Sequence, residues 1–490
     1  MTKYADRLIG KIIVLACIIS AVYLVYSIAA TQFLPVQYLL AISALLVILV
    51  ACMSLLIWKT KSKFCYVFAT VLAVLFLVID IVGGVYLSKT TSTVKSITTT
   101  STQTAVVGIF VRSDDPNDFN EVAADYTYGV LAELDRQNTD AAVEQFYAEF
   151  GLQMHTVDYA GLPGLIDALL EGETDAIILN VAYLDLLEEM DGYRDIAERI
   201  RQVTFQSVEK PKNGFDMTST GNEPEEPEES HSDVFTMYIS GSDSRVGLAD
   251  QSRSDVNILA VVNAETRQVL LISTPRDFYV PLSISDGKKD KLTHAGIYGI
   301  DVCMDTIGML YDVDVDYYFR VNFTGFVDII DALGGITVDS EQEFQVGKYT
   351  FTAGANELDG DAALVFARER YTFADGDRQR GRNQMAVIKG VINKMLSKDM
   401  LVHYVSVLMA LEDSFETSVP FAMVSRLVRT QLRDGGRWNI VSYSVNGTDA
   451  SQIPYSMSQY AYVMIPDETT VSTAKDLVQA VLAGETIKQP

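Results

Sequence analysis

The start of the chain is a succession of long apolar runs separated by short polar breaks. Residues 12–29, 35–58 and 64–87 are almost uninterrupted hydrophobic segments. About 20 apolar residues in a helix span the hydrocarbon core of a bilayer, so residues 1–88 are predicted to form three transmembrane helices. A cleaved signal peptide would have a single, shorter apolar region. The pattern therefore favours a permanent membrane anchor.

Basic residues around these segments predict their orientation. Three of them lie at positions 3–11, before the first segment, and three lysines lie at 59–63, between the second and third. Because basic loops stay in the cytoplasm, we expect a cytoplasmic N-terminus and an extracellular chain after about residue 88. Asp80 lies in the third segment, near its outer end, where interfacial exposure or contact with another helix is favoured over a functional intramembrane charge.

Beyond the apolar segments, stretches typical of strands alternate with stretches typical of helices. Residues 89–104 are rich in Ser and Thr and are predicted to be a tether. Strands are expected at 106–112, 154–159, 175–180 and 201–208, and helices at 121–134, 140–150, 164–172 and 182–190. This alternation predicts a small accessory α/β domain over residues 105–208 with a largely parallel sheet.

A second α/β domain is predicted after a change in composition. Residues 209–233 are rich in Pro, Glu, Ser and Gly without periodicity, which is typical of a linker. The strand-like runs FTMYIS, VNILAVVN and VLLIS follow it, and FVDIIDALGG is a helix that ends at glycine. Residues 382–397 carry an apolar stripe with helical spacing. The second domain is expected to cover residues 234–486.

Charge separates the two ends of the molecule. The chain of 490 residues is 49% hydrophobic and has a formal net charge of −26. Residues 1–89 contain seven Lys or Arg and two Asp, a net charge of +5, so the remainder carries −31. An acidic ectodomain disfavours nucleic acid as a partner. Cys303 is its single cysteine, which excludes an internal disulfide there.

Three motifs with Arg and Asp each lie beside a predicted strand. GSDSR (241–245) follows FTMYIS, RSD (253–255) precedes VNILAVVN, and TPRD (274–277) follows VLLIS. Asp243 and Asp255 offer the oxygen ligands of a hard divalent cation, and Arg276 suits a phosphate group. Each motif alone is also compatible with a solvated turn and an internal ion pair. Their repetition at strand ends, where open α/β folds bind ligands, favours a site.

Two further motifs concentrate arginine. Arg368 and Arg370 in FARERY (366–371) would point to one face if the backbone there is extended, and such a pair suits an anion. Pairing with acidic neighbours is the alternative. GDRQRGRNQ (376–384) places arginines at the start of the last amphipathic helix, where the helix dipole favours anions instead. Arg with Asp, and no evident Ser, Cys or His nucleophile, indicates diphosphate chemistry with Mg²⁺ rather than acyl transfer or redox chemistry.

The chain resembles the LytR–CpsA–Psr family of cell-wall glycan transferases over residues 240–395. The matching segments are GSDSR, RSDVNILAVVN, LLISTPRDFYVPL, KLTHAGIYG, DYYFRVNFTGFVDIIDALGGITVD, ELDGDAALVFARERY and GDRQRGRNQMAVI. Three apolar segments and an additional α/β domain are similar to the capsule-associated branch. The resemblance implies an α–β–α catalytic domain with a hydrophobic pocket for a polyprenyl tail, to which FVDIIDAL and AVIKGVINKML would contribute.

Roles for individual residues also come from the resemblance. Asp243 and Asp255 would hold Mg²⁺ or Mn²⁺, and Asp377 would activate an acceptor hydroxyl. The implied diphosphate-binding residues are Arg253, Arg276, Lys291, Arg368, Arg370, Arg382 and Gln384, of which Arg276, Arg368 and Arg370 would join Asp377 in catalysis.

The resulting hypothesis is a membrane-anchored transferase. It would move a glycan, expected to be capsular polysaccharide, from a polyprenyl-diphosphate carrier to peptidoglycan, alongside other capsule-assembly proteins. A non-enzymatic membrane regulator, or a sensor that binds polyprenyl phosphate, is the first alternative. A phosphatase that hydrolyses the lipid diphosphate is the second, since water and a sugar hydroxyl differ only as acceptors.

Overall fold

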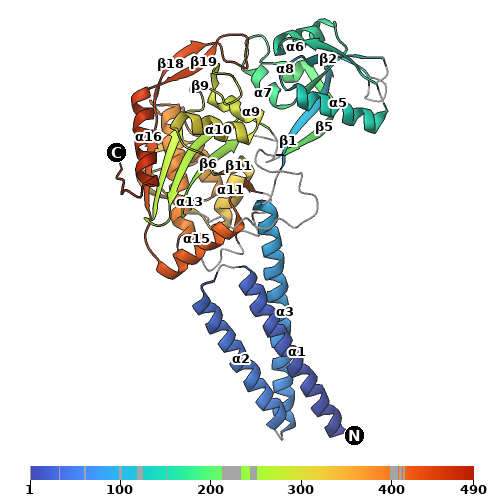
Figure 1. The fold of residues 1–490 in the computed structure, drawn as a ribbon, viewed down its shortest axis with the longest axis vertical. Coiled ribbons are helices and arrows are strands. Elements are labelled where there is room, and N and C mark those ends of the chain that lie inside the picture. The colour runs from blue at the N-terminus through green and yellow to red at the C-terminus, as the bar shows by residue number, and fades with distance from the viewer. Residues whose placement is uncertain are drawn as a thin grey trace. The chain divides into compact units, whose positions relative to one another are not determined.

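The computed structural model divides the chain into two compact units (Figure 1). The first comprises residues 1–99, 393–412 and 419–437, and the second comprises residues 100–392, 413–418 and 438–490. The structure describes residues 2–31, 34–59, 62–98, 102–117, 125–151, 153–211, 233–242, 251–397, 407, 411 and 414–489. The predicted linker therefore lies almost wholly outside the described residues, as does Asp243.

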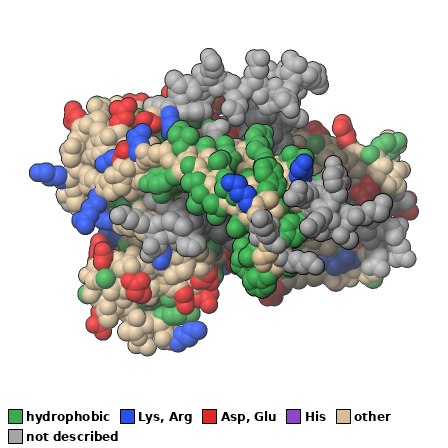
Figure 2. All heavy atoms as spheres, turned by 90° about the horizontal axis from the view of Figure 1, so that it is seen from below, with side chains coloured by type: hydrophobic (Ala, Val, Ile, Leu, Met, Phe, Trp, Pro, Cys, Tyr) green, Lys and Arg blue, Asp and Glu red, His purple; other side chains and the backbone are tan. Residues whose placement is uncertain are grey.

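The first unit contains the three predicted apolar helices. They are α1 (Thr2–Ala30), α2 (Val36–Lys59) and α3 (Lys63–Thr98). Each is long and apolar enough to cross a membrane, and hydrophobic side chains gather on the surface of this bundle (Figure 2). The same unit includes the amphipathic helix α15 (Phe421–Asp434). Helix α3 continues into the segment predicted as a tether, so the first half of that segment is helical.

Asp80 illustrates how the bundle accommodates a carboxyl group. Its side chain is buried and accepts a hydrogen bond of 3.0 Å from the Ser20 hydroxyl on α1. A buried polar group is stable only when it is hydrogen-bonded, and the serine provides that bond. Asp80 therefore makes the helix contact that its position in the third apolar segment favours.

The accessory domain has one five-stranded sheet in the second unit. Its strands are β1 (Thr102–Arg112), β2 (Thr127–Leu131), β3 (His155–Tyr159), β4 (Ala176–Asn180) and β5 (Ile200–Pro211), in the order β3-β2-β4-β1-β5. Its helices are α5 (Arg136–Phe150), α6 (Leu162–Glu171), α7 (Ala182–Glu188) and α8 (Ile196–Arg199). Strand β4 is buried along its whole length, as expected of a central strand with helices on both faces.

Two expectations for this domain are wrong. Residues 127–131 form strand β2 rather than part of a helix over 121–134, because Tyr128, Val130 and Leu131 are buried between helices and neighbouring strands. The sheet is mixed rather than largely parallel. Strand β2 is parallel to β3 and β4, whereas β1 is antiparallel to both β4 and β5. A strand that is buried on both faces is a continuous apolar run whether it is parallel or antiparallel to its neighbours. Periodicity therefore does not distinguish parallel from antiparallel pairing.

A six-stranded sheet organises the rest of the second unit, which we call the six-stranded domain. Its order is β16-β11-β6-β7-β8-β17. The strands are β6 (Val234–Ser242), β7 (Val256–Asn263), β8 (Gln268–Thr274), β11 (Tyr317–Asn322), β16 (Phe415–Thr417) and β17 (Asn439–Ser444). Strands β6, β7 and β8 form an antiparallel meander, and β11 and β17 extend it on either side by parallel pairing.

Helices cover both faces of this sheet, which gives the expected α–β–α arrangement. They are η1 (Leu292–His294), α9 (Ala295–Tyr298), α10 (Ile300–Tyr311), α11 (Phe323–Ala332), α12 (Gly360–Arg368), α13 (Asp377–Met395) and α16 (Glu468–Leu482). Short strand pairs complete the domain: β9 (Tyr279–Pro281) with β10 (Lys289–Lys291), β12 (Ile336–Ser340) with β15 (Gly354–Leu358), β13 (Phe344–Val346) with β14 (Tyr349–Phe351), and β18 (Gly447–Gln452) with β19 (Ala461–Pro466).

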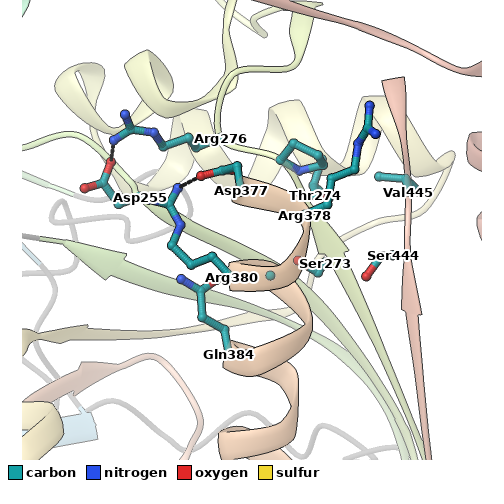
Figure 3. Close-up of a pocket in the computed structure, with 12 residues that line it drawn as sticks. Asp255, Ser273, Thr274, Arg276, Asp377, Arg378, Arg380, Gln384, Ser444 and Val445 are labelled. Carbon is teal, nitrogen blue, oxygen red and sulfur yellow. Dashed lines mark hydrogen bonds and ion pairs between the residues drawn. The ribbon is translucent and has the colours of Figure 1, made fainter. Parts of the chain in front are cut away.

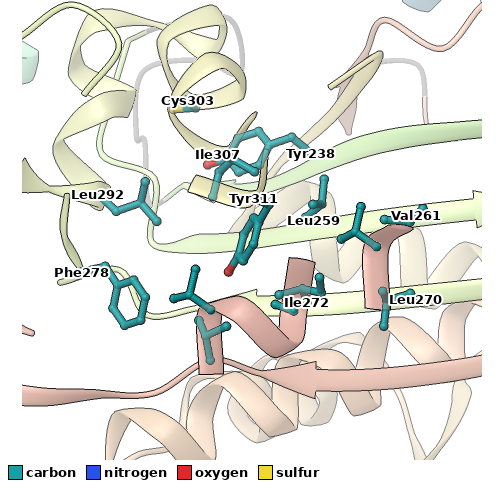
Figure 4. Close-up of a cluster of buried hydrophobic side chains, with 14 of the residues drawn as sticks. Tyr238, Leu259, Val261, Leu270, Ile272, Phe278, Leu292, Cys303, Ile307 and Tyr311 are labelled. Atoms are coloured by element: carbon teal, nitrogen blue, oxygen red, sulfur yellow. The ribbon is translucent and has the colours of Figure 1, made fainter. Parts of the chain in front are cut away.

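The main core lies between the sheet and helices α10 and α16 (Figure 4). On α10, Ile300, Cys303, Ile307 and Tyr311 are buried at spacings of three and four, so they share one face. The Tyr311 hydroxyl is 2.7 Å from that of Thr274, which satisfies the polar end of a fully buried ring. This contact ties α10 to the end of β8, beside the site described below.

Gly325 provides a test of packing in this domain. An added Cβ there would overlap the backbone oxygen of Ser414, and this neighbour is backbone rather than a flexible side chain. Gly325→Ala should therefore lower the free energy of unfolding by about 2 kcal/mol, a typical cost of overpacking. The measurement is the thermal unfolding midpoint of the full chain in detergent. Gly164→Ala, in α6 with no atom within 4 Å of the added Cβ, should unfold at the same or a higher temperature. Equal midpoints for Gly325→Ala and the wild type would contradict this packing.

Candidate active site

A polar pocket lies at one edge of the six-stranded sheet (Figure 3). Strand β8 ends there at Thr274, β17 ends beside it at Ser444, and the antiparallel β7 begins there after Asp255. Helix α13 begins against the same edge. The lining residues are Asp255, Ser273, Thr274, Pro275, Arg276, Asp377, Arg378, Arg380, Gly381, Gln384, Ser444 and Val445. The pocket thus unites RSD, TPRD and GDRQRGRNQ.

Register explains how two of the motifs meet. Asn257 pairs with Thr274 across β7 and β8, so the residues just outside this pair leave the sheet together. Arg276 Nη1 lies 2.8 Å from Asp255 Oδ1, and its Nε lies 3.5 Å from Asp277 Oδ2. Burial alone lowers the pKa of the Arg276 guanidinium, but the two carboxylates outweigh it and raise that pKa above its usual value. Arg276 therefore stays charged in a largely enclosed position.

Helix α13 supplies a second ion pair to the pocket. Asp377 pairs with Arg380 one turn later, and Gln384 follows one turn beyond, so all three lie on one face. Burial lowers the pKa of Arg380, and the positive charge of Arg276 acts in the same direction. A Cβ at Gly381 would lie 2.8 Å from the Ser273 hydroxyl oxygen. Glycine at this position lets α13 approach the end of β8.

Arg382 is on another side of the same helix. Its guanidinium lies 3.0 Å from Glu341 and 2.7 Å from Asp375, and it does not line the pocket. Arg380 lines it instead. Helical spacing from Gln384 would have identified this residue, because position 380 is one turn before it whereas position 382 is displaced by about 200°. The role expected of Arg382 in binding phosphate stays a prediction.

The two arginines of FARERY have different environments. Helix α12 ends at Arg368, an exposed residue whose guanidinium carbon lies 4.1 Å from the centre of the Phe323 ring. Arg370 follows the helix and lies 4.0 Å from Asp377, with its guanidinium donating a hydrogen bond to the Tyr371 hydroxyl. The premise of a shared extended face therefore fails at Arg368. Only Arg370 adjoins the charged residues of the pocket.

Arg253 and Lys291 are held by an acidic residue of the accessory domain. Glu189, which directly follows α7, lies 2.5 Å from Arg253 Nη1 and 2.6 Å from Lys291 Nζ. Lys291 Nζ is also 3.7 Å from Asp277, which connects this group to Arg276. Five of the seven expected diphosphate-binding residues thus form two adjacent groups, and Arg368 and Arg382 belong to neither. No feature of the sequence around position 189 had indicated its partners.

One described carboxylate of the pocket, that of Asp255, could ligate a magnesium ion that keeps water and phosphate ligands. Asp255 is one candidate ligand, and Asp243 follows β6, whose Gly241 pairs with Val256. Among the described residues, no group of three or more His, Cys, Asp or Glu could hold a metal. Mg²⁺ commonly binds through one or two carboxylates together with substrate phosphates. Asp255 at the pocket fits that pattern, although Arg276 engages its carboxylate here.

Comparisons with known proteins agree on one family. The LytR_cpsA_psr family model matches residues 197–478. The chain is 33% identical over 231 residues to the polyisoprenyl-teichoic acid–peptidoglycan teichoic acid transferase TagU of Enterococcus faecalis, covering 47% of this chain and 72% of that protein. It is 35% identical over 190 residues to TagU of Bacillus subtilis, covering 39% of this chain and 61% of the relative.

Solved structures of similar proteins each cover about half of the chain. The crystal structure of Bacillus subtilis TagU has 29% sequence identity and a TM-score of 0.41, covering 53% of this chain and 100% of that one. TagT bound to LI-WTA has 25% identity and a TM-score of 0.41, covering 51% and 91%. The family match begins at residue 197, so the apolar helices and most of the accessory domain lie outside it.

Titration of His294 should make stability depend on pH. Burial alone lowers the pKa of this histidine, but Asp290, whose carboxylate is 2.7 Å away, and Glu189 outweigh it and raise that pKa. A raised folded-state pKa adds stability that is complete below the unfolded value of about 6.5 and is lost as the pH rises through the folded-state value. The difference in unfolding midpoint between wild type and His294→Gln should therefore shrink from pH 6 to pH 9.

The exposed His155 provides the control for this measurement. His155→Gln should give a difference from the wild type that varies little over the same pH range. A His294→Gln difference that is constant, or that grows with pH, would show that the imidazole is not held in its charged form by these carboxylates.

Proposed function

The chain belongs to the LytR_cpsA_psr family, and we propose that it is a membrane-anchored transferase that moves a glycopolymer from a polyprenyl-diphosphate carrier to peptidoglycan. The observation that carries this proposal is the pocket in which Asp255, Arg276, Asp377 and Arg380 meet at the sheet edge. Two partly buried Asp–Arg pairs present fixed charges where a diphosphate would react. Preorganised charge of this kind is a main source of rate enhancement in phosphoryl transfer.

In the proposed reaction, a hydroxyl oxygen of the peptidoglycan sugar attacks the phosphorus that bears the glycan. The bond from this phosphorus to the bridging oxygen breaks, a phosphodiester forms, and polyprenyl phosphate leaves with the bridging oxygen. Arg276 and Arg380 would stabilise the negative charge that develops on the leaving group. Asp377 would accept the hydroxyl proton, because it faces the pocket beside both Arg380 and Arg370.

A divalent ion belongs to this proposal. Asp255 and Asp243 would hold Mg²⁺ or Mn²⁺, which would supply positive charge to the diphosphate. Arg276 would then exchange part of its contact with Asp255 for the substrate phosphate, since Asp277 lies close enough to keep it paired. The cationic side chains remain the protein's own contribution to charge stabilisation.

The surfaces of α11 and of the second half of α13 suit an apolar tail. Phe323, Phe326 and Val327 on α11 and Ile388 and Val391 on α13 are only partly buried, although they lie on helices that pack in the domain. Helix α13 also supplies Asp377, Arg380 and Gln384 to the pocket, and a lipid with a diphosphate head requires both a charged pocket and apolar surface. We propose that these helices contact the polyprenyl chain.

The cellular setting follows from the apolar helices and the positive charges around them. Three helices able to span a membrane tie the pocket to the bilayer that contains a polyprenyl carrier. We propose that the N-terminus is cytoplasmic and the pocket extracellular, where peptidoglycan lies. Capsular polysaccharide is the proposed glycan, because three such helices and an accessory domain resemble the capsule-associated branch. The relatives described above are named as teichoic acid transferases.

Arg276→Ala should abolish most of the transfer activity. The full chain in detergent is incubated with a lipid-linked glycan, peptidoglycan fragments and Mg²⁺, and mass spectrometry measures linked product. Loss of a charged contact to the reacting phosphate should reduce the rate by roughly 100-fold. Arg194→Ala, which removes an exposed arginine, should retain full activity. A fully active Arg276→Ala variant would refute the assignment of this pocket.

The product distribution separates transfer from the other two functions. Linked glycan supports the transferase. Release of lipid phosphate without linked product, across several acceptors, would instead identify a phosphatase. Lipid binding without any turnover would identify a sensor.

Removal of divalent ions should stop the reaction. EDTA is expected to reduce linked product by at least roughly tenfold, because the ion supplies charge to the diphosphate. Addition of excess Mg²⁺ or Mn²⁺ should restore linked product. Ca²⁺ should restore it less well, because it prefers larger and more flexible coordination. Undiminished transfer in EDTA would exclude the metal from the mechanism.

A further inference from the structure

The carboxylate of Glu189 lies in a cradle formed by Arg253, Lys291 and His294. Its two oxygens are 2.5 Å from Arg253 Nη1 and 2.6 Å from Lys291 Nζ, and the second oxygen is 3.8 Å from His294 Nε2. The three cradle residues belong to the six-stranded domain, whereas Glu189 follows helix α7 of the accessory domain. One domain thus inserts a negative charge among cations of the other.

The cradle is enclosed, so its charges are not screened by solvent. The side chain of Lys291 is 7% exposed, that of His294 is fully buried, and those of Arg253 and Glu189 are 14% and 20% exposed. Burial alone raises the pKa of Glu189, but His294 and Lys291 outweigh it and hold that pKa well below its usual range. The carboxylate is therefore ionised at neutral pH, and the cradle binds an anion.

The two domains are packed together around this contact. Apolar residues of the accessory helices form one buried cluster with Ile297 and Met457 of the six-stranded domain. Gln251 donates its backbone N–H to Thr104 and accepts a side-chain hydrogen bond from Asn180. This arrangement holds Glu189 in the cradle through neighbouring contacts as well as through its own charge.

The cradle adjoins the pocket through Asp277. Asp277 lies 3.7 Å from Lys291 Nζ and 3.5 Å from Arg276 Nε, so a single carboxylate separates the two groups of cations. A diphosphate has two phosphate groups, and one group in the pocket would bring the other close to the cradle. Glu189 would then repel it, because like charges a few ångströms apart in an enclosed site strongly disfavour each other.

We propose that Glu189 is an internal competitor of the substrate, which occupies an anion subsite that a phosphate group of the diphosphate takes during turnover. This inference rests on the proposed function, because it requires a diphosphate in the adjoining pocket. Displacement of Glu189 would leave Lys291 buried without its closest partner, and phosphate is the group that restores neutrality there. Substrate binding would thereby release the accessory domain from the cradle.

A single charge removal tests this competition. Glu189→Gln keeps the shape of the side chain and its capacity to accept hydrogen bonds but removes the negative charge. The full chain in detergent is titrated with farnesyl diphosphate by calorimetry in the presence of Mg²⁺. The dissociation constant of Glu189→Gln should be roughly tenfold lower than that of the wild type, since a repulsive charge is gone. Glu188→Gln, which removes an exposed charge one residue earlier, should match the wild type.

The outcomes distinguish this inference from the function on which it rests. If Glu189→Gln binds no more tightly, while the wild type binds and Arg276→Ala does not, the competition is refuted and the diphosphate site stands. If neither the wild type nor any variant binds the diphosphate, both the function and the inference are refuted.

A second measurement uses the wild type alone and does not depend on how a variant folds. Amide hydrogen exchange in residues 182–190 is followed with and without farnesyl diphosphate. Displacement of Glu189 should increase exchange in this segment by severalfold, because α7 loses its charged anchor. Unchanged or slower exchange on binding would refute the displacement.

Discussion

The structure of the site depends on the need to neutralise cationic side chains at an enclosed sheet edge. Arg276 is mostly buried, and a buried charge without a partner would cost several kcal/mol. Asp255, which precedes β7, and Asp277, the next residue after Arg276 in the chain, both pair with the Arg276 guanidinium. The register of β7 and β8 brings Asp255 to that place. The antiparallel meander is therefore a condition for the ion pairs, and the ion pairs are a condition for the pocket.

The same constraint explains why the charges suit a transferable phosphate. Arg276 and Arg380 are each paired with a carboxylate on a neighbouring turn or strand, whereas Arg378 donates a hydrogen bond to the Gly447 carbonyl. Much of the positive charge of the pocket is therefore neutralised before substrate arrives. An entering diphosphate can take over these contacts without leaving a buried cation unpaired. Membership of the LytR_cpsA_psr family and the proposed transfer of a glycopolymer are consistent with this arrangement. In the proposed function, the apolar helices would keep the reaction on the membrane that supplies the lipid.

The accessory domain adds an element outside the family match, which begins at residue 197. Its Glu189 carboxylate pairs with Arg253 and Lys291, and Lys291 also lies near Asp277, which pairs with Arg276. Packing of the accessory helices against Ile297 and Met457 makes this contact specific. The accessory domain therefore interacts electrostatically with cationic residues beside the site.

Patterns along the chain predicted most of what depends on local periodicity, with residues 127–131 as an exception. Three apolar runs predicted the membrane helices, the α/β class followed from alternating elements, and the motifs around Asp255, Arg276 and Asp377 predicted a charged site at strand ends. Helical spacing also favours Arg380 over Arg382 as the residue that lines the pocket, although residue type alone does not distinguish the two.

Other features depend on contacts between distant segments, which no local pattern encodes. Strand β2 replaces a predicted helix because neighbouring elements bury Tyr128 and Val130, and burial on both faces conceals strand direction. Arg368 does not share an extended face with Arg370, because α12 continues to Arg368. Glu189 meets Lys291 across 102 positions of sequence. This ion pair forms only through the packing of the two domains, because electrostatic pairing depends on distance in space rather than along the chain.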